Sequence, residues 1–239
     1  MIWFAGDPHG RFEHIVNAVK SQSPEALILL GDLECTLPLD RILRPILDLT
    51  QVWFIPGNHD ADSSQYWDNL IHSGLGHRNL HGQVVEIDGL RVAGLGGIFE
   101  APIWMPGHNN EGPQNHREMV EQLRARREQA DIFDSKCQRY RAAIFPDDYF
   151  QLAMDSADIL VTHQAPSFHR HGFEAIDELA GFMGITHLFH GHYHEDVRYP
   201  NSLRDSGFEG YSVGFRSIVD LDGRIIHTHP QLAYESFRC

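Results

Sequence analysis

The chain has 239 residues, 42% of them hydrophobic, which is enough for a substantial core in one larger α/β domain. Its formal net charge of −14 argues against non-specific nucleic-acid binding over the whole surface, although it leaves a phosphate-bearing substrate open. No apolar run approaches the roughly 18–20 residues of a membrane helix, and the N-terminus lacks the features of a signal peptide. The three cysteines, Cys35, Cys137 and Cys239, lack the spacing of a zinc-thiolate site. We therefore expect a cytoplasmic protein that does not bind membranes.

The first 60 residues predict alternating strands and helices. Three apolar runs predict buried strands, at residues 2–5, 26–30 and 52–55. Helical spacing occurs over residues 12–20, and a helix over 40–49 is interrupted by Pro45. This order implies parallel strands joined by right-handed crossovers, so the segments after the strands meet at one edge of the sheet.

The middle of the chain predicts a hairpin followed by an insertion. Strands at 84–87 and 91–95 flank Asp88-Gly89, which is typical of a type I′ turn. A loop is expected over 98–113, and one long polar helix over 115–134. We interpret 1–239 as a single domain that carries a mostly helical cap insertion at 98–157. The arginines of this insertion either form a solvated surface or face an anionic substrate.

The α/β pattern resumes after the insertion. Strands are expected at 158–161 and 186–189, around a helix at 173–183. The last strands are expected to form an antiparallel meander, at 210–213, 216–221 and 224–227 with a turn at Asp222-Gly223.

Five short motifs follow predicted strands, and they carry side chains that bind metals. They are Asp7-Pro8-His9, Gly31-Asp32, Gly57-Asn58-His59-Asp60, Thr162-His163 and Gly191-His192-Tyr193-His194. Open α/β sheets place their active sites where strands end. Carboxylate and amide oxygens mixed with imidazoles suit divalent transition metals, and there are enough of them for two ions. These motifs use five of the 17 histidines, and the other twelve have no evident role.

The ordered set of motifs resembles the calcineurin-like metallophosphoesterase superfamily, whose pattern is DxH, GD, GNH[DE], a lone His and GHxH. The resemblance implies an α/β fold, a metallophosphoesterase-type β-sandwich flanked by helices. It also implies two divalent ions (Mn²⁺, Fe²⁺/Fe³⁺ or Zn²⁺) bridged by one carboxylate. The first ion would be held by Asp7, His9, Asp32 and His194. The second would be held by Asp32, Asn58, His163 and His192.

A two-metal site implies hydrolysis of a small phosphomonoester or phosphodiester, nucleotides included, by attack of a metal-bridging hydroxide. We assign His59 as the general acid or as a donor to the phosphoryl oxygen, and we expect Asp60 to orient its imidazole. Candidates for binding the substrate phosphate are Arg11, Arg124, Arg126 and Arg127.

Several alternatives remain open. A Ser/Thr-type protein phosphatase or a dinucleoside polyphosphate hydrolase would carry GDxx[DE]R, but here Asp32 is followed by Leu33-Glu34-Cys35-Thr36. A non-enzymatic scaffold would be expected to have lost metal ligands, and a nuclease would need a longer basic surface. We expect a small phosphate ester as the partner, without extended nucleic-acid binding. The sequence leaves the oligomeric state open.

Overall fold

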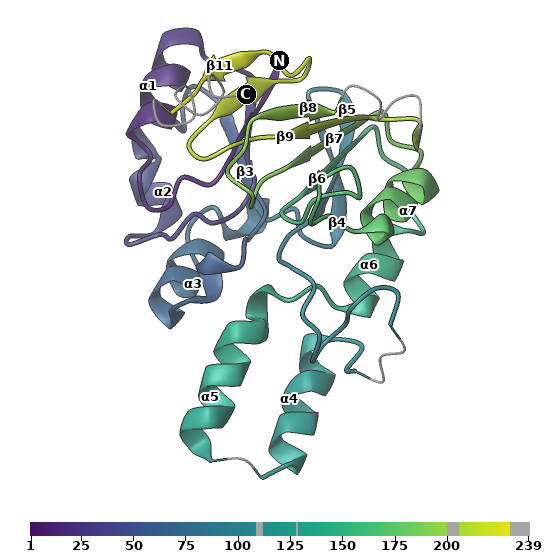
Figure 1. Cartoon of the computed structure of the whole chain (residues 1–239). Coiled ribbons are helices and arrows are strands. Elements are labelled where there is room, and N and C mark those ends of the chain that lie inside the picture. The colour runs from purple at the N-terminus through teal and green to yellow at the C-terminus, as the bar shows by residue number, and fades with distance from the viewer. Residues whose placement is uncertain (109–111, 128, 200–205, 230–239) are drawn as a thin grey trace.

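Two mixed β-sheets pack face to face with helices on their outer faces, as the resemblance implied (Figure 1). The computed structural model describes residues 1–108, 112–127, 129–199 and 206–229. Cys239 lies outside the described residues, as do parts of the expected loop and long helix, at 109–111 and 128. None of the helices in these described segments combines the length and apolar composition needed to cross a bilayer.

The first sheet brings the three N-terminal strands together in parallel. Its spatial order is β11-β10-β1-β2-β3. The strands are β1 (Ile2–Ala5), β2 (Ala26–Leu29), β3 (Gln51–Phe54), β10 (Ile218–Asp220) and β11 (Ile225–His227). Ala5 pairs with Leu29, and Leu29 pairs with Phe54, so the three parallel strands end at the same level. The first three motifs therefore begin side by side.

The second sheet carries the other two motifs. Its spatial order is β4-β5-β6-β7-β9-β8. The strands are β4 (Gln83–Ile87), β5 (Leu90–Leu95), β6 (Ile159–Thr162), β7 (His187–His190), β8 (Val197–Tyr199) and β9 (Glu209–Ser212). The predicted β4–β5 hairpin is confirmed, and Asp88 and Gly89 both have the positive φ angles, 51° and 76°, of a type I′ turn.

The remaining elements cover the sheets and link their strands. The α-helices are α1 (Glu13–Gln22), α2 (Leu39–Ile42), α3 (Ser64–Ile71), α4 (His116–Ala125), α5 (Ala130–Arg139), α6 (Pro146–Leu152) and α7 (Glu174–Met183). Short 3₁₀ turns are η1 (Arg44–Ile46), η2 (His59–Ala61), η3 (Gly76–Arg78) and η4 (Tyr140–Ala142). The interrupted helix predicted around Pro45 is confirmed as α2 followed by η1.

Alternate side chains of each strand enter different layers of the core. Phe4 of β1 faces the second sheet, where its ring stacks on that of Phe189 in β7 at 3.7 Å between centroids. Trp3, beside it in sequence, faces the opposite way and packs in the layer that contains Ile15 of α1. Successive side chains of a strand point to opposite faces, and both faces are buried here. This explains why the strands were continuous apolar runs in the sequence.

The expectation of one long helix over 115–134 is wrong. The chain forms two helices, α4 and α5, because Arg127 adopts a left-handed φ of 50° and Gln129 is extended. The reversal allows Met119 and Leu123 to pack in a small separate core with Phe133 and Cys137. Figure 1 shows this two-helix hairpin projecting away from the sheets.

The expected C-terminal meander is also only partly correct. The β10–β11 hairpin forms with its turn at Gly223, whose φ is 72°. However, β9 runs parallel to β7 in the second sheet, and the chain then crosses to the first sheet beside β1. Gly6 permits this crossing, since a Cβ atom there would lie 2.2 Å from the carbonyl oxygen of Val213.

We expect the Phe4–Phe189 stack to be a main contributor to stability, because it joins the two sheets in a fully buried layer. Phe189→Ala should lower the free energy of unfolding by about 3–5 kcal/mol, as truncations of buried aromatic residues do. Urea unfolding followed by circular dichroism measures this change. Phe182→Ala is the matched control, since Phe182 is 66% exposed. Equal effects of the two substitutions would contradict this account of the core.

Candidate metal centre

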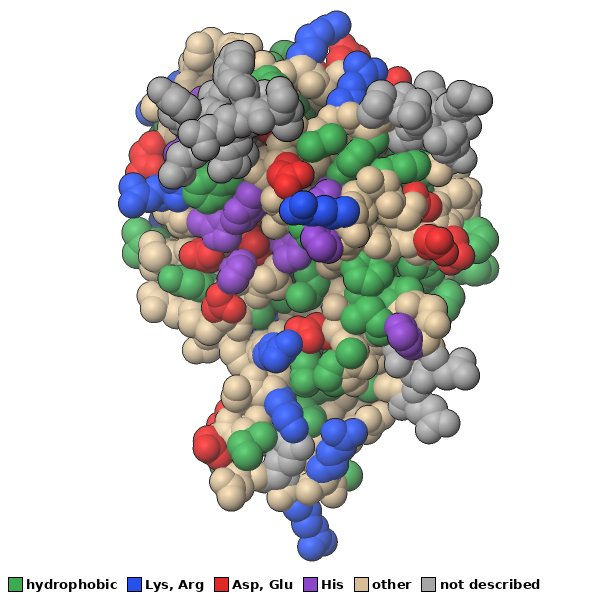
Figure 2. All heavy atoms as spheres, viewed as in Figure 1, with side chains coloured by type: hydrophobic (Ala, Val, Ile, Leu, Met, Phe, Trp, Pro, Cys, Tyr) green, Lys and Arg blue, Asp and Glu red, His purple; other side chains and the backbone are tan. Residues whose placement is uncertain are grey.

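The five motifs converge at the ends of the parallel strands of both sheets. They follow β1, β2 and β3 in the first sheet, and β6 and β7 in the second. Figure 2 shows histidine side chains gathered with acidic ones on one face of the body, above the projecting hairpin. Because the sheets pack face to face, loops more than 100 residues apart in sequence contribute to one site.

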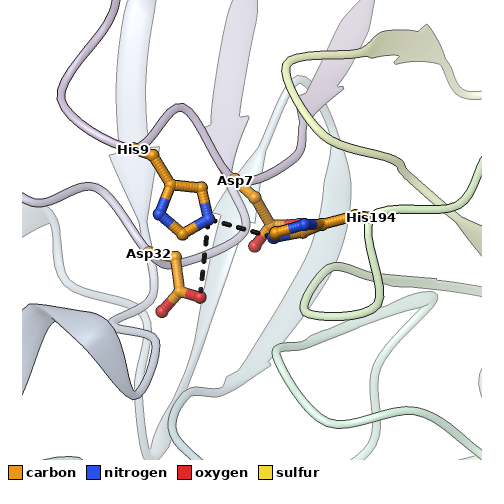
Figure 3. Close-up of side chains that lie close together, drawn as sticks. All are labelled: Asp7, His9, Asp32 and His194. Atoms are coloured by element: carbon orange, nitrogen blue, oxygen red, sulfur yellow. Dashed lines mark hydrogen bonds and ion pairs between the residues drawn. The ribbon is translucent and has the colours of Figure 1, made fainter. Parts of the chain in front are cut away.

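One group of ligands surrounds the first expected metal position. Asp7, His9, Asp32 and His194 each offer a ligand atom within 4.8 Å of the others. His9 Nε2 lies 3.0 Å from His194 Nε2 and 4.0 Å from Asp32 Oδ2. Figure 3 shows the four side chains pointing toward one another.

A second group shares Asp32 with the first. Asp32, His163 and His192 also place ligand atoms within 4.8 Å of one another. Asn58 joins them, since its Oδ1 lies 3.1 Å from His163 Nε2, and this nitrogen lies 3.4 Å from Asp32 Oδ1. The two oxygens of Asp32 therefore face different groups, Oδ2 toward His9 and Oδ1 toward His163. This is the arrangement that a bridging carboxylate requires.

Hydrogen bonds orient two of the imidazoles toward these positions. His163 Nδ1 lies 2.7 Å from the carbonyl oxygen of Leu30, to which it donates, so Nε2 keeps its lone pair for the site. His9 Nδ1 hydrogen-bonds to Glu34 Oε1 in the same manner. A carboxylate or carbonyl behind a metal-binding histidine sets its tautomer and its orientation. Both contacts fit histidines that bind cations.

The buried charges of the site also favour a cation. Burial, helped by the charge of Asp32, raises the pKa of Asp7 to about 8. Burial opposes protonation of His163, but the carboxylates of Asp32 and Asp7 raise its pKa to about 9. Burial lowers the pKa of His192 to about 3, so this imidazole is neutral. Without ions, the charge of Asp32 is therefore balanced by a protonated His163, and a divalent cation would replace that proton, neutralise the carboxylates and accept the nitrogen lone pairs.

The comparisons with known proteins agree with this geometry. Residues 1–196 match the family described as calcineurin-like phosphoesterase. The chain belongs to this family. An uncharacterized protein of Haemophilus influenzae is 39% identical over 230 residues, which cover 95% of this chain and 96% of that protein. The crystal structure of TT1561 of Thermus thermophilus has a TM-score of 0.58 at 17% identity, covering 94% of this chain and 96% of that one, and shows a shared fold.

The ligands of this calcineurin-like site themselves adopt an uncommon backbone conformation. Five of the seven expected ligands have positive φ angles: Asp7 (37°), His9 (43°), Asp32 (51°), His192 (74°) and His194 (61°). Residues other than glycine adopt this conformation at a cost of about 1 kcal/mol each, and Asp and His tolerate it better than most. The sequence predicts these residues as ligands but carries no signal of this strain.

The structure places Asp62, rather than Asp60, beside His59. His59 Nδ1 lies 2.7 Å from Asp62 Oδ2, whereas the buried Asp60 accepts three backbone N–H groups. Its Oδ1 binds Leu33 and Glu34, and its Oδ2 binds Gly57, each at 2.8 Å. Asp60 therefore ties the loop after β2 to the loop after β3. The expectation that Asp60 orients His59 is corrected, because residues one apart on a helical turn point in different directions.

The structure does not bring the hairpin arginines to the site. Arg124 lies in the last turn of α4 and Arg127 in the connection to α5, which Figure 1 shows at the far tip of the projection. A cation that the sequence analysis missed is Arg216, whose Nε donates to the carbonyl oxygen of Pro8 at 3.2 Å. Its guanidinium lies 4.3 Å from the ring centroid of Phe215. Burial and the like charge of Arg11 lower the pKa of Arg216, so Arg11 adds to the same positive region.

The loop after His163 supports the last motif from behind. Gln164 Nε2 donates to the hydroxyl of Tyr193 at 2.7 Å, and this hydroxyl donates to the carbonyl oxygen of His171 at 2.8 Å. The ring of His169 stacks on Tyr193 at 3.9 Å between centroids. His169 and His171 thus pack against Tyr193, the residue between His192 and His194. This packing gives two of the twelve histidines outside the motifs a structural role.

Gly57 lies so close to the ligands that a single methyl group there should disrupt them. A Cβ atom would lie 2.3 Å from Asp32 Oδ1 and 2.7 Å from His163 Cε1. We expect Gly57→Ala to weaken metal binding by about 10–100-fold, as other changes that misplace ligands do. The metal content of purified protein after loading with Mn²⁺ and desalting, by inductively coupled plasma mass spectrometry, measures this.

Gly181→Ala provides the control, because nothing lies within 4 Å of a Cβ atom at that helical position. A Gly57→Ala protein that retained the metal content of the parent would show that these residues do not form the metal site.

Proposed function

We propose that this calcineurin-like phosphoesterase is a dinuclear-metal-dependent enzyme that hydrolyses a small phosphomonoester or phosphodiester, nucleotides included. The observation that carries the proposal is the position of Asp32, with one oxygen toward His9 and the other toward His163. The family match over residues 1–196 supports the reaction class. All seven ligands of the family pattern are present, which argues against a scaffold that has lost its chemistry.

The donor set fits two ions of the Mn²⁺, Fe²⁺/Fe³⁺ or Zn²⁺ type. Asp7, His9, Asp32 and His194 would hold one ion, and Asp32, Asn58, His163 and His192 the other. When bound, such a pair supplies an activated water and neutralises the charge of the phosphoryl oxygens. Asn58 contributes a neutral ligand, so seven ligands with only two carboxylates leave the site positive for an anionic substrate.

His59 is proposed to donate a proton or a hydrogen bond to the departing or phosphoryl oxygen. Its ring centroid lies 5.6 Å from that of His9, which places it beside the first ligand group. Asp62 holds Nδ1, so Nε2 is the nitrogen left for the substrate. Burial opposes protonation, but the hydrogen bond from His59 to Asp62 raises the pKa of His59 and favours the charged form. A protonated imidazole can serve as a general acid.

Substrate anchoring is proposed to involve Arg216 and Arg11 in place of the hairpin arginines. Phe215, under the guanidinium of Arg216, lies 5.6 Å from His9 and 5.2 Å from His194 between ring centroids. This cation therefore sits at the edge of the first ligand group, where a substrate phosphate or its leaving group would pass.

Other aspects of the proposal rest on the sequence. We propose a cytoplasmic protein, whose cysteines lack a disulfide pattern, with a small phosphate ester as its partner. The net charge of −14 supports the absence of extended nucleic-acid binding. We also propose that the chain is one domain with its insertion at 98–157.

Hydrolysis of p-nitrophenyl phosphate and bis-p-nitrophenyl phosphate tests the reaction class. Metal-stripped protein should be inactive, and Mn²⁺ should restore turnover. Asp32→Ala should lower kcat by at least about 10³-fold, since the residue serves both ligand groups and the ions carry most of the charge stabilisation.

Asp131→Ala, at an exposed position of α5, is the matched control and should keep the activity of the parent. Turnover that survives in Asp32→Ala, or that needs no metal, would contradict a dinuclear mechanism. The ratio of monoester to diester rates then selects the substrates to screen.

Asp62→Asn separates positioning of His59 from metal binding. Loss of the carboxylate should lower kcat by about 10–100-fold while bound metal stays unchanged, because Asp62 contacts His59 and neither ligand group. His59→Ala should be at least as severe, and the double variant should be no worse than His59→Ala alone. Additive losses in the double variant would show that Asp62 acts through another residue.

A further inference from the structure

A separate cavity lies between the body and the base of the two-helix hairpin. Its volume is about 670 Å³, and its walls come from α3, the segment that follows β3, the beginning of α4 and residues 141–148. Sites for small molecules typically measure about 300–1,000 Å³ and are mostly apolar with a few polar groups. None of the seven expected metal ligands lines this cavity. It is therefore distinct from the metal centre.

Among the described residues, Asp68 is the carboxylate that forms an ion pair with Arg141, whose guanidinium lines this cavity. Its Nη1 atom is buried and has no hydrogen-bond partner in the described part of the chain. The carboxylate at Asp68 lies 3.9 Å away, which is an ion-pair distance but too long for a hydrogen bond. Buried polar atoms are nearly always hydrogen-bonded, and leaving a charged donor unpaired is costly. The partly exposed guanidinium therefore lacks a hydrogen-bonded carboxylate among the described residues, and an anionic ligand in the cavity would supply an acceptor.

The other charged groups around the cavity already have partners. Arg117 donates to Glu121 at 3.0 Å, outside the cavity. Asp148 accepts the backbone N–H of Phe145, and its Oδ2 lies 3.4 Å from His81 Nε2. Among the described residues of this wall, Arg141 is thus the arginine without a carboxylate at hydrogen-bonding distance.

An apolar surface faces the same space. Trp67 and Ile71 come from α3, and Pro56 and Phe145 line the other walls. The guanidinium carbon of Arg141 lies 5.9 Å from the ring centroid of Trp67, so the charged and the flat apolar surfaces are adjacent. A bare inorganic anion would leave this apolar surface in contact with water. A flat ring that carries an acidic group would satisfy both.

We propose that this cavity binds a small aromatic anion, with its carboxylate or phosphate on Arg141 and its ring against Trp67. The ligand would contact both the body and the base of the hairpin, next to the loop after β3 that carries Asn58 and His59. Pro56 directly precedes Gly57, α3 follows η2, and Gln138 of α5 donates to the carbonyl oxygen of Ala61 at 3.0 Å. Binding does not depend on the proposed phosphoesterase activity, because none of these contacts involves a metal ligand.

Fluorescence titration of the full-length, metal-free protein with 1-anilinonaphthalene-8-sulfonate, an aromatic anion, tests the proposal. We expect saturable binding of one probe per chain. Arg141→Met should weaken this binding by about ten-fold or more, the effect of losing one hydrogen bond to a charged group. Trp67→Leu should weaken it too, and gives a second variant if Arg141→Met folds poorly by thermal melting. Arg139→Met is the matched control, because Arg139 pairs with Glu100 outside the cavity.

Competition identifies the acidic group of the ligand. Displacement of the probe by adenosine monophosphate but not by benzoate would indicate an aromatic phosphate, and the reverse an aromatic carboxylate. If inorganic phosphate displaced the probe as well as adenosine monophosphate does at the same concentration, the ligand would not need an aromatic ring, and this part of the proposal would be wrong. Equal probe affinity in the parent, Arg141→Met and Trp67→Leu would overturn the proposal, since the probe would then bind elsewhere on the surface.

Discussion

The carboxylate of Asp32 is the group on which the rest of the site depends. It is buried at the end of the central parallel strand of its sheet, and its two oxygens face ligands supplied by different loops. The backbone N–H of His59 donates to Oδ1 at 2.9 Å, and Gly57 packs against the same oxygen. Burial opposes its ionisation, but the His163 charge holds the pKa of Asp32 below its usual range. The carboxylate therefore stays charged, compensated without ions by the cationic His163 and the His59 N–H.

The packing of the two sheets holds their edges together around this carboxylate. Phe4 and Phe189 stack between the sheets a few residues before His9 and His192, so the same packing that stabilises the core sets the spacing of the ligands. Rigid strand ends can also hold Asp7, His9, Asp32, His192 and His194 in left-handed conformations that a free loop would leave. The expected ligands are thus held in place by the fold without an ion.

The insertion behaves differently from this rigid centre. Its hairpin has its own small core and meets the body at its base, where Gln138 contacts Ala61, while Arg139 pairs with Glu100 inside the insertion. A cap that supplies arginines to the substrate is not what the geometry favours, because the end of α4 and its connection to α5 lie at the far end of the projecting hairpin. The cavity at this base lies between the hairpin and Pro56, which precedes the segment that carries Asn58 and His59.

The sequence by itself determined most of the strands and the family, and it predicted the ligand set, because buried parallel strands are continuous apolar runs and each motif follows one directly. Only the tertiary structure decided which carboxylate serves which histidine. Residues one apart on a 3₁₀ turn diverge and residues three apart eclipse, so His59 meets Asp62 while Asp60 turns inward to the backbone. Long-range pairing likewise assigned β9 to the second sheet and brought Arg216 to Pro8, beside the first metal ligands. Such choices depend on the packing of distant segments, which local periodicity does not encode.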